Sequence, residues 1–175
     1  MERCIDDELP FEIPENWCWC RLESVITLLS GTDFPPDEYN DVGKGIAYIT
    51  GASNIVNSQI LVNRWTEAPR QIVHSGDVLL VCKGSGYGKT VICNIEQAHI
   101  ARQIMAILKN DLLVMQYVQL FLDSNFELLK TKGQGVIPGI DRTSVLRLLF
   151  PLPPLAEQHR IVQRIEKLLP LVKGL

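Results

Sequence analysis

The chain has 175 residues, 46% hydrophobic and 21% charged, which is typical of one globular domain with a hydrophobic core. No apolar run is long enough to cross a bilayer, and the acidic N-terminus lacks the apolar segment of an export signal. We therefore expect a cytoplasmic protein without membrane contacts.

Net charge is −3, but it is unevenly distributed along the chain. Residues 1–45 carry 11 acidic and 3 basic side chains, whereas residues 46–175 carry 9 acidic and 14 basic ones. A moderately basic body of this kind can present a positive face to a nucleic acid. A mixed solvated surface would explain the same charges, so charge alone leaves both interpretations open.

The cysteines and histidines do not form a metal-binding pattern. Five cysteines occur without a C-x-x-C pair, and the three histidines are isolated from them and from one another. Structural zinc sites need such paired ligands. We therefore predict free thiols and no metal.

The first 109 residues predict a mostly β region. A tryptophan-rich extended segment leads into a short helical or strand-like segment that ends at Gly31, and a polar, turn-rich loop follows. Runs of β-branched and apolar residues then predict strands. These strands are expected within residues 46–55, 58–63, 77–82, 90–95 and 102–109.

The segment GSGYGKT, residues 84–90, has the appearance of a phosphate-binding loop. That signature needs four residues between its first glycine and the Gly-Lys pair, but the required position holds Lys83. A helix should also follow the loop, whereas the β-branched residues after it predict a second strand. We expect a glycine-rich hairpin connection rather than a nucleotide site.

Helical periodicity begins at residue 110. We predict a buried helix over residues 110–130, capped by Asn110 or Asp111, then a loop, then a strand over 145–153 that ends at prolines. From Leu155 the apolar residues are spaced by four and three, as in a coiled-coil seam. Pro170 is expected to end or kink this last helix.

Several of these segments resemble the specificity (S) subunits of type I restriction-modification systems. FPLPPLAEQHRIVQRIEKLL, residues 150–169, is similar to the start of a conserved region of that family. LPFEIPENWCWCRLESV (9–25), YITGASNI (48–55), GSGYGKTVI (84–92) and GQGVIPGIDRTSVLRLLFPLPPLAEQ (133–158) resemble other family segments in the right order. The resemblance covers nearly the whole chain.

The resemblance implies a fold and a role. A complete subunit of that family carries two target recognition domains joined by conserved helices, and each domain reads half of a split DNA sequence. Residues 1–153 would then be one α/β (α+β) recognition domain with a mixed or mostly antiparallel sheet. Residues 154–175 would be the start of the coiled-coil spacer helix.

The resemblance also implies partners and cofactors. This chain would bind double-stranded DNA and hold no cofactor. Modification subunits would bring S-adenosylmethionine, and a restriction subunit would use ATP and Mg²⁺. The helix could bind these subunits or a second copy of the chain through its apolar seam, which comprises Ile161, Ile165, Leu168 and Val172.

Candidate DNA-binding residues share a polar or basic side chain and a predicted loop position. Lysine and arginine can contact phosphates or guanine, and amides can pair with adenine. For any one of them an ordinary turn or loop role is an equal explanation. The candidates are Thr32, Ser53, Asn54, Lys83, Ser85, Tyr87, Lys89, Lys130, Lys132, Gln134 and Arg142.

Motifs of several enzyme classes are missing from the sequence. It contains no Asn/Asp-Pro-Pro-Tyr/Phe segment of an adenine methyltransferase, no acidic residue two positions before a lysine as in common nucleases, and no G-x-S-x-G elbow. We therefore expect a non-catalytic specificity component. The alternative is a non-catalytic protein-interaction module that uses the C-terminal helix.

Overall fold

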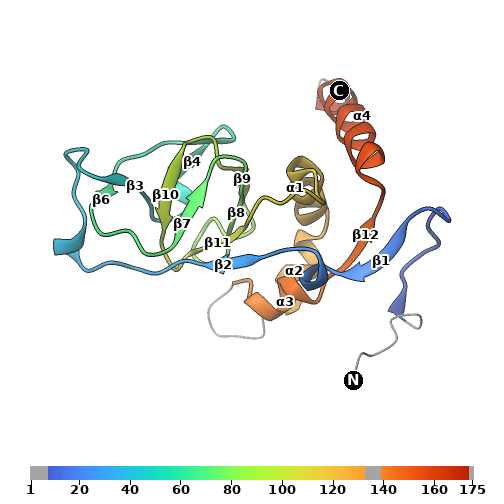
Figure 1. Ribbon diagram of the computed structural model, residues 1–175, viewed down its shortest axis with the longest axis horizontal. Coiled ribbons are helices and arrows are strands. Elements are labelled where there is room, and N and C mark those ends of the chain that lie inside the picture. The colour runs from blue at the N-terminus through green and yellow to red at the C-terminus, as the bar shows by residue number, and fades with distance from the viewer. Residues whose placement is uncertain (1–7, 133–138, 174–175) are drawn as a thin grey trace.

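The computed structural model describes residues 8–132 and 139–173. Two four-stranded sheets form the body of the domain (Figure 1). One has the order β2-β11-β8-β9 and is antiparallel throughout. Its strands are β2 (Leu28–Ser30), β8 (Val78–Val81), β9 (Thr90–Ile92) and β11 (Ile104–Ile107).

The second sheet has the order β6-β3-β10-β7 and contains one parallel pair, β3 with β10. Two short ladders complete the β structure, β4 with β5 and β1 with β12. The fold is therefore mixed α/β with mostly antiparallel pairing, as predicted. The remaining strands are β1 (Cys18–Arg21), β3 (Ile46–Ile49), β4 (Ile55–Val56), β5 (Gln59–Ile60), β6 (Trp65–Thr66), β7 (Ile72–His74), β10 (Gln97–Ile100) and β12 (Leu149–Leu152).

Strands β8 and β11 are buried on both faces. Val78 and Leu80 point into a core shared with the helices, whereas Leu79 and Val81 point into a second core between the sheets. Side chains alternate across a strand, so four consecutive apolar residues serve both cores. This explains why the segment reads as a continuous apolar run instead of an alternating one.

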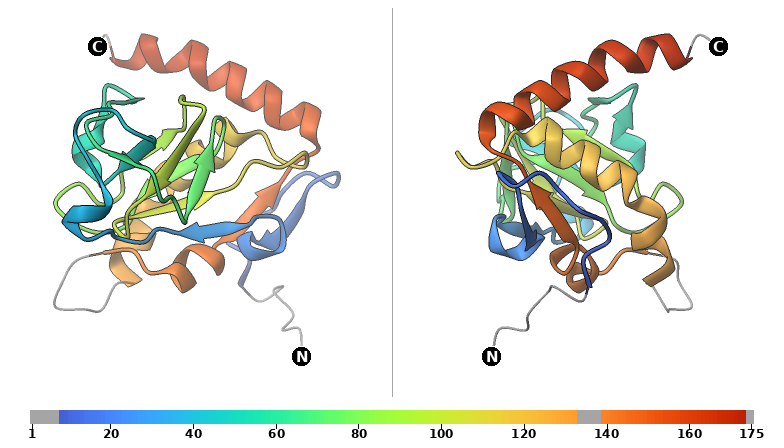
Figure 2. Two further views of the ribbon diagram at one scale, coloured as in Figure 1. Left: turned by 60° about the vertical axis from the view of Figure 1, so that its left-hand side comes forward. Right: turned by 90° about the vertical axis from the view of Figure 1, so that its right-hand side faces the viewer.

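Helices cover one side of this framework (Figure 2). They are α1 (Met115–Ser124), α2 (Phe126–Lys132), α3 (Arg142–Leu146) and α4 (Leu155–Lys173), with single 3₁₀ turns η2 (Leu22–Ser24), η3 (Pro36–Glu38) and η4 (Ala52–Asn54). Buried α1 residues such as Val118 and Leu122 pack in the helical core with Phe150 of β12. Val162 of α4 is buried in the same core.

Two helix boundaries differ from the sequence prediction. The helix expected over residues 110–130 starts at Met115 and divides at Asn125. Asn110 does not cap it, because the Asn110 amide donates to the Val25 carbonyl and accepts from the Leu112 N–H. The N-terminus of α1 has no side-chain cap.

Pro170 does not end the last helix. Helix α4 continues through it to Lys173. Proline removes one backbone donor and crowds the preceding turn, yet surrounding residues such as Leu169 and Leu171 are exposed. The backbone carbonyl one turn earlier, which loses its N–H donor at Pro170, can therefore bind water. This hydration lowers the free-energy cost of the proline.

A buried glutamine joins α4 to the domain. Gln158 is 1% exposed, and its Oε1 accepts from the Val114 N–H at 2.8 Å. Its amide group donates to the carbonyls of Leu112 at 3.2 Å and Pro153 at 3.0 Å. The side chain thus satisfies three backbone groups on both sides of the junction.

The connection between β8 and β9 is a tightly packed hairpin turn, as predicted. Gly84 and Gly88 have positive φ angles of 86° and 92°. A Cβ at Gly88 would lie 2.0 Å from Cε2 of Phe126, and one at Gly86 would lie 2.3 Å from Cβ of Ala52. These glycines are needed for packing inside the chain.

We predict that Gly88→Ala will destabilise the protein by more than about 2 kcal/mol, because it adds overpacking against Phe126 to backbone strain. Gly43 is the matched control, since its φ is 82° but a Cβ there would meet nothing within 4 Å. Gly43→Ala should cost only about 1 kcal/mol. Urea unfolding measures both values, and equal losses would contradict the packing explanation.

We predict that Gln158→Ala will lower the free energy of unfolding by about 1–3 kcal/mol, because it leaves buried backbone groups without partners. Gln163→Ala on the exposed side of the same helix should stay within about 0.5 kcal/mol of the parent protein. Urea denaturation of both variants tests this difference. Equal unfolding midpoints would show that Gln158 does not anchor α4.

Candidate nucleic-acid interface

Three loops meet at the tip of the β8–β9 hairpin. They are residues 51–54, 83–89 and 101–103. A Cβ at Gly51 would lie 2.5 Å from Oε1 of Gln103, and one at Gly84 would lie 3.3 Å from the same atom. Gln103 therefore lies between the other two loops and joins them into one surface.

The hairpin tip presents charge to solvent. Lys83, Ser85 and Lys89 are exposed, and the backbone of Lys83 bridges to Gly139. The base of the hairpin is fixed because Thr90 donates to Asp123 at 2.6 Å and accepts from Gln119 at 3.1 Å. Two lysines thus flank a rigid tip, which suits contacts to phosphates.

Tyr87 and Lys130 lie beside this tip but make contacts within the chain. Tyr87 is half-buried and packs edge-on against Phe126 with ring centroids 5.6 Å apart. Lys130 pairs with Glu127 at 2.8 Å and lies over the Phe126 ring at 5.2 Å. Both side chains therefore contribute to packing around α2 in this conformation.

Thr32 is fixed by a buried histidine. His99 is fully buried, and its Nε2 donates to the Thr32 carbonyl at 2.7 Å while Nδ1 accepts from two backbone N–H groups. Burial lowers the pKa of His99, which favours this neutral form. The next residue, Asp33, forms an ion pair with Arg102 at 2.7 Å.

Asn54 is a correction to the candidate set. Its side chain is 1% exposed, and its Oδ1 accepts from both the N–H and the hydroxyl of Thr50. Its amide donates to the Leu61 carbonyl and to Oδ1 of Asn63. Asn54 therefore holds its loop together and cannot also reach a base, whereas the neighbouring Ser53 is exposed.

The remaining candidates are divided between surface and undescribed positions. Arg142 is exposed at the start of α3, and its Nη1 donates to Ser30 at 3.1 Å. Gln134 and the side chain of Lys132 lie outside the described residues. They stay predictions.

Sequence reasoning missed the polar residues on the adjoining loops. Gln103, Asn63 and Arg64 carry no motif; Gln103 directly precedes β11, and the pair Asn63-Arg64 comes just before β6. A polar residue at a strand end is the only signal that could have marked them. The proximity of Gln103 to the hairpin depends on tertiary structure.

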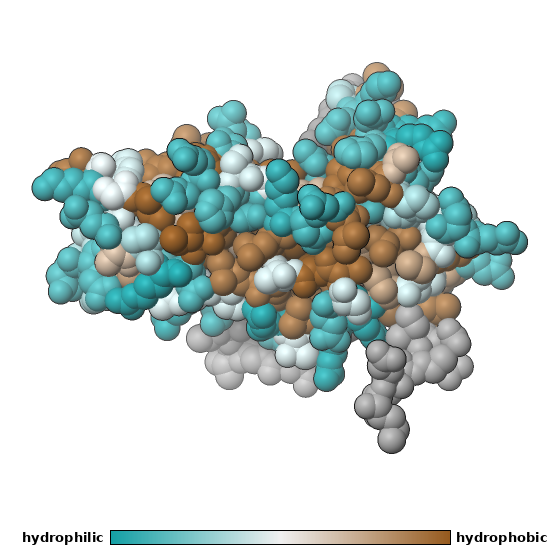
Figure 3. Space-filling model, viewed as in Figure 1, coloured by the Kyte–Doolittle hydropathy of each residue, from teal (hydrophilic) through white to brown (hydrophobic). Residues whose placement is uncertain are grey.

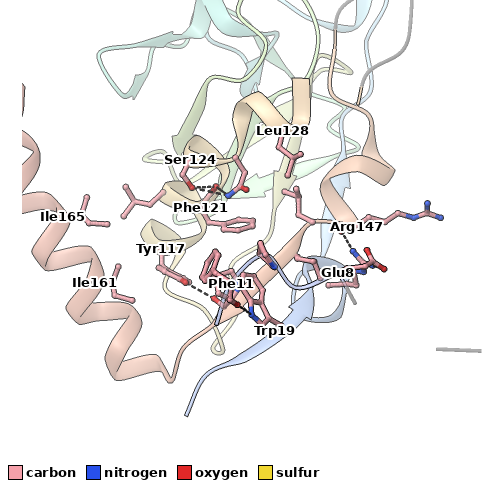
Figure 4. Close-up of a pocket in the computed structure, with 17 residues that line it drawn as sticks. Glu8, Phe11, Trp19, Tyr117, Phe121, Ser124, Leu128, Arg147, Ile161 and Ile165 are labelled. Carbon is pink, nitrogen blue, oxygen red and sulfur yellow. Dashed lines mark hydrogen bonds and ion pairs between the residues drawn. The ribbon is translucent and has the colours of Figure 1, made fainter. Parts of the chain in front are cut away.

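A separate apolar groove of about 770 Å³ lies between α1, α4 and the N-terminal segment (Figure 4). Ile161 and Ile165 of the predicted seam line it, together with Phe11, Trp19 and Tyr117. Burial raises the pKa of Tyr117 to about 12, so its hydroxyl stays protonated and donates to the Pro151 carbonyl.

The seam is therefore split between the domain and solvent. Ile161 packs against the helical core, whereas Leu168 is 53% exposed. The side chain of Val172 lies outside the described set. Figure 3 shows hydrophobic residues gathered across the middle of the face that carries α1 and α2.

Within residues 8–132 and 139–173, no group of three or more His, Cys, Asp or Glu side chains could hold a metal ion. The four cysteines in that part of the chain are free thiols, as predicted. None of the helices described there has the length and apolar character needed to span a membrane.

Comparison with known proteins identifies the family. The specificity subunit of the type I restriction enzyme EcoAI from Escherichia coli is 28% identical over 94% of this chain, which covers 30% of that protein. The putative MjaX specificity subunit from Methanocaldococcus jannaschii is 26% identical over 93% of this chain and 39% of that protein. The chain thus spans about a third of these relatives.

Solved structures show the same fold. The HsdS subunit from Thermoanaerobacter tengcongensis matches with a TM-score of 0.82 and 25% identity, over 94% of this chain and 40% of that one. A chain from a structural study of type I R-M system assembly and conformational transition matches with a TM-score of 0.83 and 26% identity, over 94% of this chain and 41% of that one. The family described as "Type I restriction modification DNA specificity domain" matches residues 14–173, and the chain belongs to this family.

Proposed function

We propose that this chain is a DNA target recognition module that directs the methylation and cleavage carried out by other subunits of a type I restriction-modification enzyme. The family match over residues 14–173 carries the proposal. The three joined loops with exposed Lys83 and Lys89 support it, because they offer a rigid, basic surface. The family match does not favour the alternative of a general protein-interaction module.

Chemistry would then reside on the partners. The chain recognises double-stranded DNA in the cytoplasm and supplies no catalytic group. Modification subunits bring S-adenosylmethionine, and the restriction subunit brings ATP and Mg²⁺. Residues 1–153 are the recognition domain, and residues 154–175 begin the spacer helix, which can also pair with a second copy.

The decisive experiment assembles the specificity subunit that carries this sequence with its modification subunits. Methylation of a randomised duplex pool, followed by sequencing of the methylated products, should enrich one split sequence. An assembled complex that methylates all sequences equally, or none, would contradict the proposal.

We predict that Lys83→Ala and Lys89→Ala will each weaken DNA binding for all sequences and reduce the slope of log affinity against log salt by about one. Each lysine that neutralises a phosphate releases condensed counterions, and this effect is independent of base sequence. Binding to cognate and scrambled duplexes over a salt series measures it. Lys167→Ala on α4 is the control, and unchanged slopes for both loop variants would place the hairpin away from DNA.

We predict that Leu168→Asp will weaken binding to the modification subunits or to a second copy without unfolding the domain, because Leu168 is largely exposed. Ile161→Asp should instead destabilise the protein by at least about 2 kcal/mol, since it places a charge against the core. Sedimentation, pull-down and thermal unfolding separate these effects. Unchanged association of the Leu168 variant would exclude the distal seam as a docking surface.

A further inference from the structure

A polar groove of about 450 Å³ opens beside the second sheet. Strand β3 ends at its rim, and the residue pair Asn63-Arg64 comes just before β6. Polar side chains from four separate segments line it. Among the lining residues are Asp33, Tyr39, Ser53, Asn63 and Arg64.

The Asn63 amide is held in one orientation. The buried amide of Asn54 donates to Oδ1 of Asn63 at 3.1 Å, and Thr50 in turn fixes Asn54. Asn63 itself is exposed. An exposed amide whose oxygen and nitrogen ends are distinguished by a buried partner is preorganised to pair with a complementary donor and acceptor, such as N6 and N7 of adenine.

Arg64 is also positioned before any ligand arrives. Its guanidinium lies over the Tyr39 ring at 5.9 Å, and its Nη1 donates to the Asn63 carbonyl at 3.1 Å. Stacking leaves the edge of the planar group to donate further hydrogen bonds. A fixed guanidinium edge is suited to the two acceptors of guanine.

The groove adjoins the basic hairpin. Ala52, next to Ser53, lies directly against Gly86 of the hairpin, and Gln103 lies between Gly51 and Gly84. A duplex whose phosphates contact Lys83 and Lys89 would therefore have neighbouring base edges close to the groove. The Asp33 carboxylate, held by Arg102, adds an acceptor to the lining of the groove.

We propose that this groove reads bases of the target half-site and that Asn63 and Arg64 are specificity-determining residues. The inference rests on the proposed function, because it requires that the chain binds DNA. The ligand is a pair of neighbouring purine edges in the major groove, recognised by one amide and one guanidinium. Ser53 supplies a hydroxyl at the rim of the same site.

The test uses the specificity subunit that carries this sequence, assembled with its modification subunits. A randomised duplex pool is first selected with the parent complex to define its sequence. Binding of the selected and a scrambled duplex is then measured for Asn63→Ala, Arg64→Ala, Arg64→Lys and the exposed control Arg164→Ala on α4. Thermal unfolding of each variant verifies its fold.

We expect Asn63→Ala and Arg64→Ala to lose roughly 5- to 150-fold in affinity for the selected duplex, the fold-change equal to the ~1–3 kcal/mol of a bidentate base contact. Affinity for the scrambled duplex should change far less. Arg64→Lys should keep the salt dependence and still lose discrimination, because lysine lacks the planar pair of donors. A new selection with either Ala variant should relax one position of the sequence.

The outcomes separate this inference from the proposed function. If the parent complex selects no sequence, DNA recognition itself is wrong. If it selects a sequence that both Ala variants bind with parental affinity, the groove does not read bases while DNA recognition stands. Equal losses on selected and scrambled duplexes, with a reduced salt slope, would make Arg64 a phosphate contact and overturn base reading.

Discussion

Strands β8 and β11 lie side by side in the middle of the domain with no face exposed to solvent, and the arrangement of the other elements depends on this pair. One face of the pair supports α1 and the start of α4, and the other supports the second sheet. Burying both faces of two adjacent strands removes much apolar surface from water for few residues. The loops at the strand ends are consequently attached to strands that are buried along their whole length.

The candidate interface shows why rigidity matters for recognition. The hairpin begins where β8 ends and the loop 101–103 leads into β11, so both adjoin the buried pair, and Gln103 links them. Sequence readout depends on polar groups held within a fraction of an ångström of a productive position. Internal packing of Gly86 and Gly88 restricts the hairpin without using its charged side chains.

Local sequence patterns predicted much of the fold. The strands β8, β9 and β11 have strong apolar and β-branched runs, so they could be predicted without knowledge of distant contacts. The glycine loop lacked the spacing of a phosphate site, which was also a local pattern. The cap at Asn110 failed because its amide bonds to Val25, 85 residues away in sequence. Asn54 failed for a different reason: its partners Thr50, Leu61 and Asn63 are near in sequence, but the sequence does not show that the side chain is buried. The predicted end of the last helix at Pro170 was wrong, because exposure of the surrounding turn lowers the free-energy cost of the proline.

Gln158 has a mechanical consequence for the long helix that it anchors. Helix α4 has 19 residues and so is about 28 Å long at 1.5 Å per residue. Gln158 and Val162, in the first two turns, are its buried contacts with the core. The rest of the helix extends beyond this anchored segment (Figure 2). A rotation of about 10° about Gln158 would move the end of the helix at Lys173, about 22 Å away, by about 4 Å. Loosening one buried amide would therefore misplace anything held at the distal end, even though no contact there had changed.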